Sequence, residues 1–197
     1  MKSSNFFSTA AKRQKGFTLV ELIIVVAVIA LLSLLGIPFV RDFIVEGKVQ
    51  PTGSDITKIV TKIRANMSGS GAAPYVALGA PAAATAVFAN TARGLASSMT
   101  VAGVGATATA QHDIGAAGSQ IAVAQANLGM AGDSFTVTFP TVNKAACPGL
   151  ATQVSRSAEV ITINGTQVKA VNGLYNGATA QNACNAGDAN TFVFTFR

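Results

Sequence analysis

The feature that most constrains this chain is an apolar run of 24 residues, from Phe17 to Val40, which contains a single charged side chain, Glu21. As an α-helix the run is about 36 Å long, enough for the hydrocarbon core of a bilayer. A charged side chain in such a helix costs about 2.5–3.5 kcal/mol on insertion scales. We therefore predict a transmembrane helix in which Glu21 has a role and a partner.

The residues before this run predict its orientation. Lys12, Arg13 and Lys15 precede it directly. The positive-inside bias keeps a basic flank of this kind in the cytoplasm. Everything after Val40 is then expected outside the cytoplasmic membrane.

A secretory signal and a plain membrane anchor are the simpler alternatives. A secretory signal has an apolar core of about 7–15 residues followed by a small-residue cleavage site. This run is longer, and no clear Ala-x-Ala site follows it. A plain anchor fits the length but gives no reason for Glu21 or for a glycine, Gly16, between the basic and apolar parts.

The stretch Gly16-Phe17-Thr18-Leu19-Val20-Glu21 resembles the processing site of type IV prepilins and of the related pseudopilins. The resemblance implies a leader over residues 1–16, cut by a prepilin peptidase after Gly16, and N-methylation of the new terminus at Phe17. It also implies that methylation and assembly need Glu21. Pro38 matches a proline that is common in the family, and the close match covers residues 15–38.

Cleavage after Gly16 makes chemical sense. It creates a cationic amine at Phe17, close along the helix to the carboxylate of Glu21. Leaving either charge unpaired in lipid is costly, and pairing offsets that cost. In a staggered bundle the amine of one subunit meets the Glu21 of a neighbour, which sets the register of assembly. A contact within one subunit is the open alternative.

Two stretches are expected to interrupt the helix. Gly36 and Pro38 lower helix stability near the end of residues 17–40, because proline removes a backbone donor and glycine costs about 1 kcal/mol. The outcome is either a mild kink or, as the resemblance implies, a segment that melts on entry into the filament. An amphipathic half follows over residues 41–66. We predict a break or kink near residues 47–54, and two separate helices are an alternative.

The remainder, residues 67–197, is expected to be a globular head, so that the fold class is α+β with an antiparallel sheet packed on the long helix. Asn164-Gly165 is a strong hairpin signal between two β-prone segments. The predicted strands are residues 86–88, 121–124, 134–139, 159–163, 167–171 and 191–196, the last near the middle of the sheet. The predicted short helices are residues 91–99 and 143–155.

The two cysteines, Cys147 and Cys184, are separated by 36 residues. In an exported domain such a pair favours a disulfide, and the weaker alternative is two free buried thiols. Closing this loop contributes about 3–4 kcal/mol in the chain-entropy model. The order of strand, Cys-bearing helix, hairpin, second Cys and terminal strand resembles the type IVb pilins. That resemblance implies a disulfide-bounded region, residues 147–184, on the filament surface, although Phe17 and the leader length lean towards type IVa.

Catalytic, phosphate-binding and metal-binding patterns are not found in the sequence, so we expect no enzyme activity, no metal and no cofactor. His112 is expected to be a lone exposed histidine, and Asn164-Gly165-Thr166 is interpreted as a turn and not as a glycosylation site. Without residues 1–16 the basic count falls from 14 to 10 against eight acids, so the net charge falls from +6 to +2. The remaining basic residues are scattered, which argues against nucleic-acid binding.

The leading hypothesis is the structural subunit of a type IV pilus that polymerises with its own copies. Its expected partners are a prepilin peptidase/methyltransferase, the inner membrane before assembly, and the pilus assembly machinery. The alternatives are a minor pilin or a type II secretion pseudopilin and, from another class, a membrane-anchored periplasmic enzyme. The filament would be extracellular and would serve adhesion, aggregation, motility, conjugation or DNA uptake.

Overall fold

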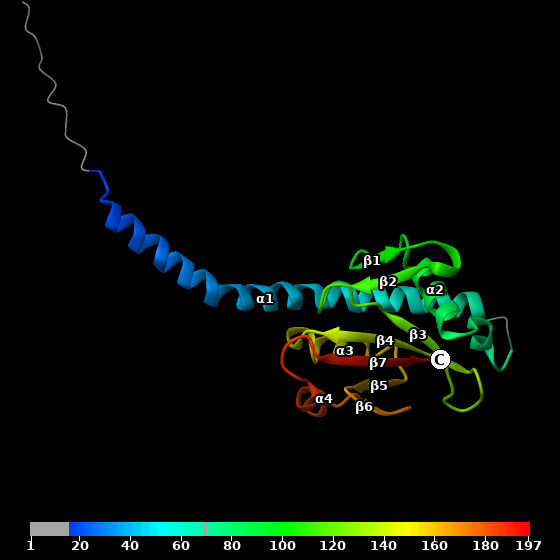
Figure 1. The fold of residues 1–197 in the computed structure, drawn as a ribbon. Helices are drawn as coiled ribbons and strands as arrows, with labels where there is room; N and C mark the ends of the chain where they lie inside the picture. The colour runs from blue at the N-terminus through cyan, green and yellow to red at the C-terminus, as the bar shows by residue number, and fades with distance from the viewer. Residues whose placement is uncertain (1–15, 69–70) are drawn as a thin grey trace, which may run out of the picture. The chain divides into compact units, whose positions relative to one another are not determined.

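The computed structural model describes residues 16–68 and 71–197. The chain divides into two compact units, Met1–Phe39 and Val40–Arg197, which are described separately. Helix α1, Leu19–Met67, contributes to both (Figure 1). The predicted leader, except for Gly16, and the basic flank lie outside the described residues.

In the first unit, α1 presents apolar side chains to solvent over residues 19–34. Every Val, Leu and Ile from Leu19 to Leu34 is between 48% and 74% exposed. The helix continues through Gly36 and Pro38. Helix melting on assembly therefore stays a prediction. Within the described residues, no helix combines the length and the mean hydropathy that a membrane span requires.

The predicted break near residues 47–54 and the two-helix alternative are wrong, because α1 is continuous there, and the kink stays a prediction. Pro51 has no N–H for the carbonyl of Gly47, but both residues are exposed, so water can satisfy that carbonyl. The buried side of the helix anchors the segment through Val49 and Ile56, which outweighs the local propensity.

The five-stranded sheet of the second unit is antiparallel throughout, in the order β3-β4-β7-β5-β6. Its strands are β3 (Ala122–Ala126), β4 (Ser134–Val142), β5 (Val160–Ile163), β6 (Thr166–Lys169) and β7 (Asn190–Phe196). The predicted terminal strand is confirmed as the central one, and Asn164 and Gly165 form the β5–β6 turn, both with positive φ. Figure 1 shows this sheet beside the second half of α1.

Phenylalanines from the two central strands fill the core between the sheet and α1. In the β4–β7 register, Phe135 lies opposite Phe196 and Phe139 lies opposite Phe192, and all four are fully buried. The ring centroids of Phe135 and Phe196 are 5.5 Å apart. Cross-strand aromatic pairs of this kind stabilise both the sheet and its register.

The segment between α1 and β3 differs most from the prediction. Residues 86–88 belong to helix α2 (Pro81–Ala92) and not to a strand. The predicted helix over residues 91–99 is wrong, because α2 ends at Ala92 and residues 93–98 form a turn that leads into β1. The β1–β2 pair forms a separate two-stranded sheet. The elements here are η1 (Pro74–Leu78), β1 (Met99–Ala102), η2 (Gly105–Thr107) and β2 (Thr109–His112).

Three short helices lie around the disulfide: two replace the single one predicted over residues 143–155, and the third, before Cys184, was not predicted. They are η3 (Lys144–Ala146), α3 (Gly149–Val154) and α4 (Gly177–Ala183). The Cys147–Pro148 peptide bond is cis. Cys147 follows η3 and Cys184 follows α4, so the two cysteines join the ends of these helices.

Candidate assembly site

The start of α1 is a reciprocal capping box built from Thr18 and Glu21. The Glu21 carboxylate accepts hydrogen bonds from the Thr18 backbone N–H and hydroxyl, both at 2.9 Å through Oε2. In return, the Thr18 hydroxyl oxygen accepts from the Glu21 N–H at 3.2 Å. The two side chains thus satisfy backbone donors that the first helical turn leaves free.

This geometry gives Glu21 a partner that the sequence analysis missed, although Thr-x-x-Glu before an apolar run is the sequence signature of such a box. Only Oε2 is used within the described residues, so Oε1 is left for another group. Phe17, next to the cap, is 90% exposed. The arrangement can hold an anion at a fixed place on the helix and accept a cation there.

In the second unit, two ion pairs tie the start of this half of α1 to loops of the head. Arg41 donates to the Asp188 carboxylate at 2.6 Å and to the Gly115 carbonyl at 3.2 Å. The amine of Lys48 lies 3.7 Å from the Asp113 carboxylate. Asp188 also accepts from the side chain of Asn143, so this contact reaches the end of β4.

The disulfide between Cys147 and Cys184 is present, with Cα atoms 6.1 Å apart. Next to it lies a network of asparagine side chains. The Asn164 amide nitrogen donates to the Ala183 carbonyl and to the side-chain oxygen of Asn190, which is fully buried. Both amide hydrogens of Asn164 are therefore engaged, which supports the interpretation of its sequon as a turn.

His112 is buried, at 2% exposure, so the prediction of a lone exposed histidine is wrong. Its Nε2 donates to the Pro140 carbonyl at 2.8 Å, and Nδ1 has no partner within the described residues. Burial lowers the pKa of His112, although the Pro140 bond and Asp113 oppose the shift. A neutral imidazole held in this way is a core residue, and the described residues hold no cluster of three or more metal-ligating side chains.

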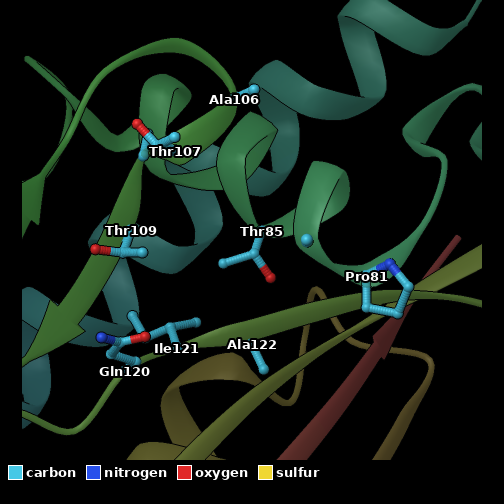
Figure 2. Close-up of a pocket in the computed structure, with 10 residues that line it drawn as sticks. Pro81, Thr85, Ala106, Thr107, Thr109, Gln120, Ile121 and Ala122 are labelled. Atoms are coloured by element: carbon cyan, nitrogen blue, oxygen red, sulfur yellow. The ribbon is translucent and has the colours of Figure 1, made fainter.

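A hollow of about 400 Å³ lies between α2, η2 and the β3 edge, and none of its lining residues carries a charge (Figure 2). Its most prominent polar group, the Thr85 hydroxyl, already accepts from the Val123 N–H at 3.0 Å and donates to the Val123 carbonyl. Thr85 therefore caps the open edge of β3 against pairing with another strand. This role is structural.

Two family profiles match the chain. The one described as PilS N terminal matches residues 48–197, and the prokaryotic N-terminal methylation motif matches residues 11–37. The crystal structure of type IV b pilin from Salmonella typhi is 26% identical with a TM-score of 0.51, over 74% of this chain and 95% of that chain. The NMR structure of the type IVb pilin (PilS) from Salmonella typhi is 27% identical with a TM-score of 0.44, over 73% and 92%. The curated protein sequences contain no match.

A long N-terminal helix that begins within a methylation motif and packs on an antiparallel sheet is the type IV pilin fold. The chain belongs to the PilS family of type IVb pilins. This confirms the predicted α+β fold and the predicted type IVb head. Pilins are structural proteins, so the prediction that the chain is not an enzyme is also confirmed.

Proposed function

We propose that this protein is the major structural subunit of a type IV pilus. The observation that carries the proposal is the exposed apolar surface of the first unit, where the large aliphatic side chains from Leu19 to Leu34 all face solvent. Surface of this extent and apolarity requires a cover. Lipid covers it before assembly, and the same segment of other copies covers it in the filament.

Processing prepares the chain for this change of surroundings. A prepilin peptidase cuts between Gly16 and Phe17, and the same enzyme or a companion methylates the Phe17 amine. The match of the methylation motif to residues 11–37 supports this step. Before assembly, residues 17–40 lie in the inner membrane with the amino terminus in the cytoplasm. This placement rests on the motif and on the exposed apolar side chains of the first unit.

Glu21 provides the register of assembly. Its Oε2 is held by Thr18, so the carboxylate has a fixed position. The Phe17 amine of an incoming subunit pairs with it, and the two charges neutralise each other in an apolar surrounding. The residues around Gly36 and Pro38 lose helicity as the subunit enters the filament. Adhesion, aggregation, motility, conjugation and DNA uptake are the candidate uses of the finished filament.

Purified surface filaments test the major-subunit role. The mature chain should be their main component, and a trace amount would instead assign a minor pilin or a type II secretion pseudopilin. Mass spectrometry should show the loss of residues 1–16 and one methyl group on Phe17. An intact leader would contradict the processing step. Tracing the chain in the filament would test the loss of helicity at Gly36 and Pro38.

A further inference from the structure

Two oppositely charged grooves lie along the second half of α1. The first, of about 420 Å³, runs between α1 and the disulfide region, and its only charged lining residue is Glu46. The second consists of two hollows of about 480 and 400 Å³ that share Lys62 and Leu95. Its charged lining residues are all cations, namely Lys58, Lys62 and Arg93. We call these the acidic groove and the basic groove.

The charges of the acidic groove have no partners within the described chain. The second unit has seven acidic residues, and four of them form ion pairs with other described residues. The three that form none are Asp42, Glu46 and Glu159. Asp42 and Glu46 lie one turn apart on α1, and both are exposed. They form a small anionic edge beside the groove.

The basic groove is also uncompensated. Lys62 is exposed and forms no ion pair among the described residues. Arg93 donates to the Gly103 carbonyl, a neutral group that leaves its charge in place. Lys58 is the exception, because its amine lies 3.0 Å from Asp55. Leu95, 41% exposed, adds apolar surface between these cations.

Helix geometry places the two edges on opposite flanks of the exposed strip of α1. At about 100° per residue, Asp42 and Glu46 lie about 160° from Lys58 and Lys62 around the axis. The exposed residues Gln50 and Thr61 lie between the two flanks. Glu46 and Lys62 are 16 residues apart in the sequence, which corresponds to about 24 Å along the axis.

We propose that neighbouring copies of this chain join laterally, with the anionic edge at Asp42 and Glu46 against the basic groove at Lys62 and Arg93 of the next copy. This inference rests on the proposed filament, in which the helices are parallel and staggered. An offset of about 24 Å along the helix brings Glu46 of one copy level with Lys62 of the other. Because the two surfaces differ, the contact is heterologous, and its offset along the helix keeps the repeat from closing into a ring, as a helical filament requires.

The charges favour a second copy over a polyanion such as a nucleic acid. A polyanion would occupy the three cations and leave the acidic edge, on the same helix, uncovered. A second copy satisfies both surfaces at once, and complementary charges of this kind fix register and exclude wrong neighbours. The contact is also sensitive to salt, since both edges are exposed.

Charge reversal in the full-length chain tests the inference in the host that assembles it. Glu46→Lys and Lys62→Glu each place like charges in contact and should lower the yield of sheared filaments at least about tenfold. The double variant Glu46→Lys/Lys62→Glu restores opposite charges and should return the yield to within about threefold of the parent. Arg156→Glu is the matched control, because Arg156 is exposed and lines neither groove.

The outcomes separate this inference from the proposed function. If the parent chain forms no filaments, the proposed function fails. If the parent does so but the single reversals assemble normally, or the double variant is no better than either, the lateral contact is wrong. An effect of Lys62→Glu that Glu46→Lys does not share would also overturn it, and would point to a separate anionic ligand.

A second measurement needs no variant. A zero-length carbodiimide applied to parent filaments should join the carboxylate of Asp42 or Glu46 to the amine of Lys62. Mass spectrometry then identifies the linked peptides. Within one chain, Glu46 and Asp42 lie about 24 and about 30 Å from Lys62 along the helix, so the link arises only between copies. The Lys48–Asp113 pair, at 3.7 Å and with both side chains exposed, serves as the internal positive control. Its link without an Asp42–Lys62 or Glu46–Lys62 link would contradict the proposal.

Discussion

At the start of α1, one carboxylate serves both the helix and the proposed assembly, and substitutions at two residues separate these roles. Thr18→Ala removes the cap but keeps the anion, and should cost about 1 kcal/mol of local helix stability. Glu21→Gln keeps a hydrogen-bond acceptor but removes the charge. If the charge pairs with an incoming amine, Glu21→Gln and Glu21→Ala should both lower filament yield at least about tenfold, and Thr18→Ala far less.

Filament yield and the cellular level of the chain are the measurements for this prediction. The head should stay folded in all three variants, because Glu21 and Thr18 lie outside its core. Normal filaments from Glu21→Gln would refute the charge role. An equal loss from Thr18→Ala would show instead that the helix cap limits assembly.

The contacts of the Asp133 carboxylate are expected to make the stability of the head depend on pH in the acid range. Its carboxylate accepts the backbone N–H of Leu128 and those of Met130 and Gly129, and it pairs with Arg197. The hydrogen bond from the Leu128 N–H does most to hold the pKa of Asp133 well below its ordinary range. Burial raises this pKa, but only enough to offset part of the lowering. The carboxylate thus fixes both the loop before β4 and the end of β7.

The unfolded chain takes up this proton at a higher pH than the folded chain does. The stabilisation by Asp133 is therefore complete at neutral pH and is lost as the pH falls below about 4. Asp133→Asn should lower the urea midpoint at pH 7 and flatten its decline between about pH 4 and pH 2. Asp113→Asn, which removes only an exposed ion pair at 3.7 Å, is the control. Parallel acid profiles for Asp133→Asn and the parent would contradict the prediction.

At the scale of elements, Gly53 fixes how closely α1 approaches α3. A Cβ built on Gly53 lies 2.6 Å from the Cβ of Gln153, whereas one on Gly47 meets nothing within 4 Å. Gly53→Ala should therefore destabilise the head by about 1–3 kcal/mol, as overpacking does. Gly47→Ala makes the same change in the same helix and should stabilise it by up to about 1 kcal/mol. Denaturant unfolding measures both, and equal effects would show that this contact is not tight.

The same segment shows what the sequence reveals and what it does not. Gly47, Pro51 and Gly53 predict a break from local propensity, yet Gly53 is present because another helix packs against it. A contact between residues 100 positions apart leaves no local signal. The β5–β6 hairpin was predicted correctly because Asn164-Gly165 carries its conformation within two residues.

Helix α2 was missed for a different reason. Its alanines give little amphipathic pattern, and the available signal was a proline, Pro81, at the first helical position. At the candidate assembly site, the sequence motif singles out Gly16, Phe17 and Glu21, whose roles stay predictions. The Thr18 cap and the grooves beside α1 were not predicted, since the grooves depend on how α2 and the disulfide region pack.

For the whole molecule, the disulfide is expected to supply a large part of the stability of the head. Cys147→Ser should cost about 3–4 kcal/mol in the chain-entropy model, for a sequence separation of 37 residues. Cys184→Ser should cost a similar amount, and the double variant no more than either, because all three lose the same bond. Denaturant unfolding and protease resistance under oxidising conditions measure this. Additive costs, or none, would contradict the prediction.

The second unit should also fold without the first. All residues of its hydrophobic core lie at or beyond Val45, so residues 40–197 carry a complete core and the disulfide. Most of the exposed large aliphatic side chains belong to the first unit. Residues 40–197 alone should therefore be a folded, oxidised monomer in plain buffer, whereas the mature chain from Phe17 should need detergent or a filament. Size-exclusion chromatography and thermal unfolding test this, and an aggregated or unfolded fragment would show that the head depends on the first half of α1.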